Sequence, residues 1–138
     1  GRVGWHDVIE ETLRWAPSIS ALPMRFAVSD IPLPDGTVIR GGDPILTTYG
    51  AAGHDPAQHG ERADRFDATR ATSEHLAFGH GVHRCLGAPL ARMEAAVALP
   101  ALFERFPDLA LAGEASELRH VDSFIAHGYA ELPVRLTA

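Results

Sequence analysis

Apolar residues recur at helical spacing near the start of the chain. Successive members of the series lie three or four positions apart: Trp5, Ile9, Leu13 and Ala16. This spacing predicts a helix over residues 5–15 with one apolar face. Pro17 follows, and because the residue before a proline avoids the helical conformation, we expect the helix to end there.

Residues 30–46 follow a different pattern, in which short β-prone runs alternate with turn signals. The runs at 37–40 and 44–46 are each preceded by a turn dipeptide, Asp-Gly at 35–36 and Gly-Gly at 41–42. Such dipeptides favour tight turns. This part of the chain is therefore predicted to form a small β-meander.

A second helix is predicted beyond a long segment, residues 49–74, that lacks periodicity and is expected to be a loop. One face of this helix is apolar, with Leu86, Leu90, Met93 and Val97. Pro89 suits its first turn, and Pro100 is expected to kink or end it. The β-prone tail, 124–136, is predicted to form a final hairpin.

The composition is that of one globular domain. The chain has 138 residues, of which 46% are hydrophobic and 22% are charged, and these values argue against a disordered tail. No apolar run approaches the roughly 20 residues that a membrane-spanning helix needs. The net charge of −6 argues against a nucleic-acid binder, since such proteins are usually basic. The chain does not begin with methionine, so we expect a piece of a longer polypeptide.

The single cysteine, Cys85, lies in the segment that carries the most chemistry. One cysteine cannot form an internal disulfide, so a cytoplasmic location is the simplest interpretation. Three glycines surround it: Gly79, Gly81 and Gly87. Glycine lets a backbone approach a flat or bulky partner closely. Because Cys85 precedes a predicted helix, free N–H groups and the helix dipole favour its thiolate, which soft or borderline metals prefer.

Four interpretations of Cys85 are open on these residues. It could be a small buried apolar side chain, the usual fate of a free cysteine. It could bind zinc with His80 and His83, although structural zinc sites usually use two separated ligand pairs. A nucleophile activated by a histidine would suit a helix N-terminus but leaves the glycines unexplained. The fourth interpretation is a haem thiolate.

The fourth interpretation has a specific pattern behind it. Four residues stand at fixed intervals in this segment: Phe78, Gly81, Cys85 and Gly87. This spacing resembles the haem-binding loop of the cytochrome P450 family, and His83 matches the bacterial form of that loop. Residues 91–94 resemble the start of the family's proximal helix.

A second match lies in the first predicted helix. Glu11 and Arg14 resemble the family's Glu-x-x-Arg pair, and residues three apart share a helix face. Arg65 resembles the third member of this cluster, with Arg62 as its rival. A planar guanidinium can hold one carboxylate from two directions, which would pin the long loop beneath the haem.

The resemblance implies a mainly α fold with small β-sheets, an α+β arrangement of the P450 type. Residues 1–138 would be its carboxy-terminal haem-binding portion, with the N-terminal and distal parts absent. Haem b would be bound with Cys85 as the axial iron ligand. Other residues implied to bind it are Arg25, Phe78, Gly79, Gly81, His83 and Gly87, with Arg25 and His83 near the propionates. Residues implied to contact substrate are Leu22, Phe124 and Ile125.

The implied activity is monooxygenation, in which one oxygen atom of O2 enters a small apolar organic substrate, as in bacterial secondary metabolism. A haem thiolate favours cleavage of the O–O bond. Electrons would come from a ferredoxin-type donor, for which His80, Arg84 and Arg92 form a candidate basic patch. Neither nucleic acid nor a membrane is expected to be a binding partner. Nothing here matches the family's proton-delivery pair, so no catalytic side chain is expected in this chain. The alternative is a truncated, inactive remnant or a haem-binding module.

Overall fold

The first helix, α1 (Trp5–Trp15), has the bounds predicted from its apolar spacing. The computed structural model describes residues 3–137, apart from the side chain of Pro23. In the first turn of α1, the Asp7 carboxylate accepts a hydrogen bond from the Gly4 N–H at 3.0 Å. That bond satisfies one of the backbone donors that a helix start leaves free. The helix ends at Trp15, before Pro17, as the stop signal predicts, and Pro17 itself is buried.

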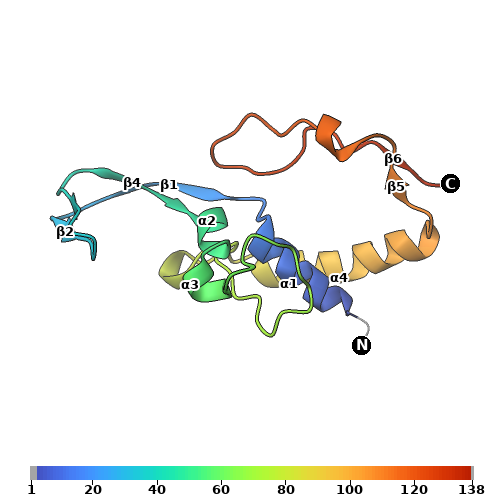
Figure 1. The fold of residues 1–138 in the computed structure, drawn as a ribbon, viewed down its shortest axis with the longest axis horizontal. Helices are drawn as coiled ribbons and strands as arrows, with labels where there is room; N and C mark the ends of the chain where they lie inside the picture. Colours follow the sequence, from blue (N-terminus) through green and yellow to red (C-terminus); the bar gives the residue numbers. More distant parts are fainter. Residues whose placement is uncertain (1–2, 138) are drawn as a thin grey trace.

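Two antiparallel strand pairs form an arm that extends from the helices (Figure 1): β1 (Ala21–Phe26) with β4 (Pro44–Thr48), and β2 (Ile31–Pro32) with β3 (Val38–Ile39). The predicted meander is confirmed for β2 and β3. Its last strand, however, turns back onto β1, which the sequence pattern did not predict. The β1–β4 register is irregular between Leu22 and Arg25. Pro23 lies there and cannot donate to the ladder, which weakens the strand signal.

Two short helices, α2 (Tyr49–Gly53) and α3 (Pro56–His59), occupy the start of the segment predicted to be a loop. The Asp55 carboxylate accepts a hydrogen bond from the Ala57 N–H at 2.9 Å, and proline holds the first helical position of α3. Both features are sequence signals of a helix start. The rest of the segment, 60–74, is irregular as predicted.

The long helix α4 (Ala88–Arg105) follows a short 3-10 turn, η1 (Gly81–His83), and packs against α1. Trp5, at the start of α1, packs against Phe103, near the end of α4, with ring centroids 5.3 Å apart. The helix continues past Pro100 to Arg105, so the expectation that Pro100 ends it is wrong. A proline removes one backbone hydrogen bond, and the flanking turns keep the helix intact.

The carboxy-terminal segment returns across the molecule above the helices (Figure 1). It contains three short elements: β5 (Ala110–Leu111), η2 (Ala115–Glu117) and β6 (Val134–Arg135). The hairpin predicted within 124–136 is wrong, because β6 pairs with β5. The Ile125 carbonyl accepts the Ser20 N–H at 2.8 Å and so ties this segment to the start of β1.

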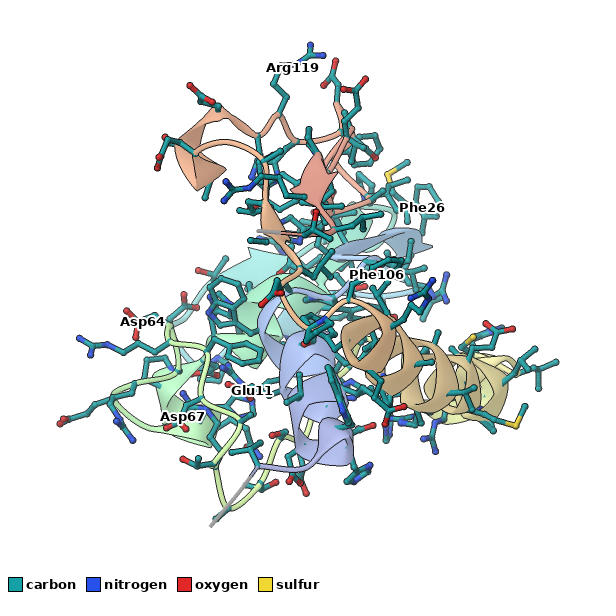
Figure 2. All side chains as sticks on the ribbon, turned by 90° about the vertical axis from the view of Figure 1, so that its right-hand side faces the viewer. Glu11, Phe26, Asp64, Asp67, Phe106 and Arg119 are labelled. Atoms are coloured by element: carbon teal, nitrogen blue, oxygen red, sulfur yellow. The ribbon has the colours of Figure 1, made fainter. Side chains whose placement is uncertain are left out.

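The core is small and its largest members are charged. Five apolar residues are buried: Ile9, Ala21, Ala27, Ala63 and Ala88. The two largest fully buried side chains are Arg14 and Glu11. Figure 2 shows Glu11 on the side of α1 that faces Asp64 and Asp67, with α4 on the other side.

The predicted apolar face of α4 is exposed to solvent. Leu86 is 99% exposed, and Leu90, Met93 and Val97 are each more than half exposed. The described structure has an accessible surface of 10100 Å². A folded monomer of this length exposes roughly 7,000 Å². The described residues therefore expose more surface than such a monomer, and this face of α4 is part of it. Among the helices of residues 3–137, none is long and apolar enough to cross a membrane.

Candidate functional site

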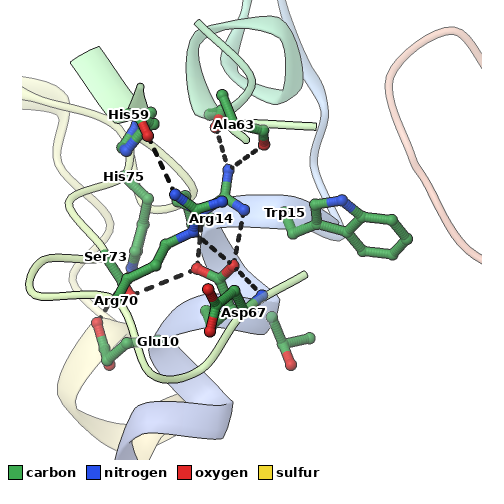
Figure 3. A network of polar contacts seen from close by, with 12 residues as sticks. Glu10, Arg14, Trp15, His59, Ala63, Asp67, Arg70, Ser73 and His75 are labelled. Carbon is green, nitrogen blue, oxygen red and sulfur yellow. Dashed lines mark hydrogen bonds and ion pairs between the residues drawn. The ribbon is translucent and has the colours of Figure 1, made fainter. Parts of the chain in front are cut away.

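Glu11 and Arg14 form a buried ion pair on one face of α1 (Figure 3). The Nε and Nη2 atoms of Arg14 each donate to one carboxylate oxygen of Glu11, both at 2.7 Å. Neither side chain is exposed. This parallel two-bond geometry is the strongest form of an arginine–carboxylate pair. The pairing expected from their spacing is therefore present.

Arg14 also binds the backbone of two other segments. Its Nη1 donates to the carbonyl oxygens of Gly53, at the end of α2, and Ala63, the latter at 2.8 Å. Its Nη2 donates to the Arg65 carbonyl at 2.9 Å. One guanidinium thus joins α1, α2 and the irregular loop.

The third charged member of this cluster is Arg70. Its Nε donates to Glu11 at 3.1 Å, and its other nitrogens donate to backbone carbonyls of the loop. The prediction that the Arg65 side chain fills this role is wrong. The Arg65 carbonyl accepts bonds from both Arg14 and Arg70, and its side chain is exposed. The rival, Arg62, pairs with Asp67 at 3.1 Å near the surface.

This cluster places two arginines around one buried carboxylate. Burial raises the pKa of Glu11, but hydrogen bonds from Arg14 and the Asp67 N–H outweigh it, so the pKa lies below its ordinary value. Burial lowers the pKa of His59, and the nearby charges of Arg14 and Arg70 lower it further. The cluster therefore holds an ionised carboxylate next to a neutral histidine at neutral pH.

A second polar cluster lies on the other side of α1. Arg92 of α4 donates to both carboxylate oxygens of Glu10, at 2.6 and 2.9 Å. His75 is a third member, with its Nε2 3.2 Å from Glu10. The bond from Arg92 is the main reason that the pKa of Glu10 lies below its ordinary value. This cluster joins α1 to α4 and to the segment that precedes the cysteine loop.

The cysteine loop is attached to this second cluster through Phe78. The Arg92 guanidinium lies over the Phe78 ring, 4.7 Å from its centroid. The Phe78 carbonyl accepts the Cys85 N–H at 2.8 Å and closes the loop. Gly79 and Gly81 have φ angles of 72° and 70°, a conformation that side chains with a Cβ rarely adopt. The loop between Phe78 and Cys85 depends on these two glycines.

The Cys85 thiol is free and exposed. The interpretation of Cys85 as a buried apolar residue is therefore wrong. Its neighbours Val82 and Leu86 are 97% and 99% exposed. A Cβ on Gly87 would lie 3.7 Å from the Cys85 sulfur, an ordinary van der Waals distance, so Gly87 stands directly beside the sulfur. Within residues 3–137, no three or more His, Cys, Asp or Glu side chains are grouped to hold a metal ion. The zinc interpretation has no support.

The remaining predicted residues lie on β1, the cysteine loop and the carboxy-terminal segment. Arg25 and His83 are exposed, and within the described structure neither side chain forms an ion pair or hydrogen bond. Leu22 follows Ala21, whose N–H donates to the Ile125 carbonyl at 3.4 Å, so these two segments are neighbours. Phe124 is 71% exposed.

The comparisons with known proteins agree with this geometry. The sequence model described as Cytochrome P450 matches residues 6–118. The chain belongs to the cytochrome P450 family. The match includes α1 with Glu11 and Arg14, the cysteine loop and all of α4.

Two P450 relatives show how far the similarity extends. The chain is 47% identical over 136 residues to 2-hydroxy-5-methyl-1-naphthoate 7-hydroxylase of Streptomyces carzinostaticus, with 99% of this chain and 33% of that protein covered. It is 46% identical to the mycinamicin IV hydroxylase/epoxidase of Micromonospora griseorubida, with 93% and 32% covered. The chain thus spans about a third of the length of these relatives.

Solved P450 structures share the fold. CYP154A1 from Streptomyces coelicolor A3(2) is 60% identical and superposes with a TM-score of 0.91, covering 97% of this chain and 34% of that one. CYP154C4 from Streptomyces sp. W2061 is 48% identical, with a TM-score of 0.94 and 98% and 33% covered. The predicted α+β fold of the P450 type is confirmed.

The residues around Cys85 fit the haem that P450 proteins bind. A haem thiolate requires one free protein sulfur. The apolar faces of Val82 and Leu86 beside that sulfur are open, as a flat apolar macrocycle requires. Arg25 and His83 are unpaired among the described residues and suit anionic propionates. The donor set therefore matches the group.

Sequence reasoning missed three members of the two clusters: Glu10, Arg70 and His75. Arg70 had a detectable signal, because it is a third arginine in the loop that supplies Arg62 and Arg65. Glu10 and His75 are 65 positions apart in the sequence and offered no local pattern. Arg92 was assigned to a surface patch, whereas it is bound to Glu10.

Proposed function

We propose that this chain is the carboxy-terminal, haem-thiolate part of a bacterial-type P450 monooxygenase. The whole enzyme would insert one oxygen atom of O2 into a small organic substrate. The observation that supports this proposal is the free, exposed Cys85, held in a glycine-dependent loop at the start of α4. The family match and the hydroxylase relatives supply the reaction class.

Each proposed residue has a distinct task. Cys85 would bind the iron of haem b, and the bound group would supply the chemistry of O–O cleavage. Arg25 and His83 would bind the propionates. Phe78, Gly79, Gly81 and Gly87 would shape the loop around the sulfur. Leu22, Phe124 and Ile125 would line the substrate side, and we expect an apolar substrate.

Electrons would come from a ferredoxin-type donor. Of the candidate basic patch, Arg92 is bound to Glu10, so its charge is already paired within the chain. His80 and Arg84 remain exposed. A docking surface for an acidic donor would rest on these two residues. Arg84→Glu should slow electron delivery and leave the absorption spectrum unchanged.

The alternative is an inactive remnant or a haem-binding module without turnover. The chain exposes 10100 Å². That is well above the roughly 7,000 Å² of a folded monomer of this length. So much open surface fits both this alternative and a part of a larger enzyme. Because the chain spans about a third of its relatives' length, we expect the chain alone to bind haem weakly.

The absorption spectrum of the reduced, CO-bound protein with haem tests the proposal. It should be recorded for the chain itself and for a chimaera in which the chain replaces the matching third of the Streptomyces naphthoate hydroxylase. A strongly red-shifted Soret band is expected, and Cys85→Ala should abolish it. The matched control is His80→Ala, an exposed neighbour with no assigned role in haem binding, which should keep the band.

Two results would contradict the proposal. A red-shifted band that persists in Cys85→Ala would show that the Cys85 sulfur does not bind the iron. A chimaera without the band would exclude haem-thiolate chemistry in this sequence. A chimaera that shows the band but produces no oxidised product would favour the module.

A further inference from the structure

Glu10 and Glu11 are neighbours on α1, yet their carboxylates bind different segments. Successive residues of a helix point about 100° apart. Glu11 binds Arg14 and Arg70 and faces the irregular loop. Glu10 binds Arg92 of α4 and His75. The Glu10 carboxylate is therefore not an isolated surface charge, because it joins α1, α4 and the segment that contains His75.

Arg92 makes two geometrically different contacts at once. Its fork donates two hydrogen bonds to Glu10, and its Cζ atom lies over the Phe78 ring, 4.7 Å from the centroid. Only a planar guanidinium can do both, because lysine carries a point charge without a fork. The Arg92 side chain is 30% exposed, and that of Glu10 is 18% exposed. The contact with Phe78 is thus set by the position of Glu10.

His75 fixes the chain just before Phe78. Its Nδ1 accepts the Ala77 N–H at 3.1 Å, so in the neutral ring the hydrogen lies on Nε2. With this tautomer, Nε2 donates to Glu10 at 3.2 Å, and the same nitrogen lies 3.2 Å from Nη2 of Arg92, so His75 contacts both other members of the cluster. The side chain is 5% exposed. Burial lowers the pKa of His75 despite the nearby Glu10, which keeps this donor–acceptor arrangement at neutral pH.

Phe78 connects the contacts of Arg92 and His75 to the cysteine. Its carbonyl accepts the Cys85 N–H at 2.8 Å. We propose that Glu10, His75 and Arg92 form a positioning cluster that sets the Phe78–Cys85 backbone contact and, through it, the direction of the Cys85 sulfur. The proposal rests on the proposed function only in its last step, the binding of that sulfur to iron.

Hydrogen exchange at the Cys85 amide tests the positioning step without haem. Arg92→Lys keeps the charge but loses the fork and the stacking plane, and Glu10→Gln removes the carboxylate. Each should reduce protection at Cys85 by about tenfold or more, while amides of α1, held by the Glu11 cluster, change little. The matched control is Arg105→Lys, because Arg105 also lies over a phenylalanine ring, 5.3 Å from the Phe106 centroid, at the far end of α4.

The spectrum of the haem-bound protein tests the last step. In the reduced, CO-bound form, Arg92→Lys and Glu10→Gln should convert part of the red-shifted Soret band to a band at shorter wavelength, and Arg105→Lys should not. Unchanged protection at Cys85 in Arg92→Lys, or equal loss along α1, would overturn the positioning role. The two proposals can fail separately. If the wild-type protein lacks the red-shifted band while Arg92→Lys and Glu10→Gln lose protection at Cys85, the proposed function is contradicted and the positioning cluster is supported.

Discussion

The carbonyl oxygen of Arg14 lies 2.1 Å from the point at which a Cβ on Gly53 would stand. The Arg14 guanidinium also donates to the Gly53 carbonyl, so both ends of the arginine contact this one glycine. α1 and α2 can approach this closely only because residue 53 has no side chain.

Gly53→Ala should therefore destabilise the protein strongly. The new methyl group overlaps backbone atoms of α1, and such overpacking costs about 1–3 kcal/mol in the free energy of unfolding. Urea denaturation monitored by circular dichroism measures the change. Gly128→Ala is the control, because a Cβ there meets nothing within 4 Å, and it should be nearly neutral. Equal stabilities of the two variants would contradict the packing of α1 on α2.

Arg70→Ala and Arg65→Ala should differ sharply. Arg70 pairs with Glu11, whose side chain is wholly buried, and its loss leaves a buried carboxylate with fewer partners. The expected cost is about 2 kcal/mol. Arg65 contributes its backbone carbonyl, which alanine retains, so its substitution should change stability by less than about 0.5 kcal/mol. The reverse order would restore Arg65 as the third member of the cluster.

The free energy of unfolding should fall as pH drops below about 6.5, the pKa of an unfolded histidine. Burial holds the pKa of His75 below that value, so between the two pKa values the unfolded chain binds more protons and stability decreases with falling pH. Glu10 has a pKa lowered chiefly by Arg92. Its contribution is present above about pH 4.3 and is lost as pH falls through its folded value.

Urea denaturation across this pH range separates the two stages. His75→Gln should reduce the first decline but not abolish it, because the pKa of His59 is lowered in the same direction. Glu10→Gln should reduce the second decline. A wild-type stability that rises between pH 7 and pH 5.5 would contradict the buried, neutral state of both histidines.

Leu86→Ser should leave the free chain as stable as the wild type, within about 0.5 kcal/mol, because the side chain is 99% exposed. In the haem-bound chimaera the same change should weaken haem retention. Ile9→Ala is the comparison, since Ile9 is 7% exposed and its truncation should cost about 2–4 kcal/mol. Strong destabilisation of the free chain by Leu86→Ser would show that this face is covered within the chain.

The sequence predicted what is encoded locally. The helix over 5–15 and the Glu11–Arg14 pair follow from spacing alone, and the structure has both. α3 also had local signals in Asp55 and Pro56, but four residues are too few to show periodicity. The bounds of α4 were obscured by Pro100, which a long helix tolerates.

The contacts that were not predicted depend on distance along the chain. β1 finds its partner β4 about twenty residues later, and β5 finds β6 beyond a long excursion. Arg70, not Arg65, contributes its side chain to the cluster, because the arginines of the loop differ in where the backbone places them and not in their chemistry. Hydrophobic periodicity carries no information about such placement.

Arg14 and Arg70 bind the carbonyl oxygens of residues 53 and 59, at the ends of α2 and α3, and of residues 62, 63 and 65 in the irregular loop. Every amino acid carries that acceptor, so the side chains of most of these positions are free to vary while the loop keeps its course. In a saturation library, positions 62 and 65 should tolerate most substitutions, whereas Glu11, Arg14 and Gly53 should tolerate almost none. The path of the loop then depends on very few side chains: Glu11 and Arg14 from α1, and Arg70 from the loop itself.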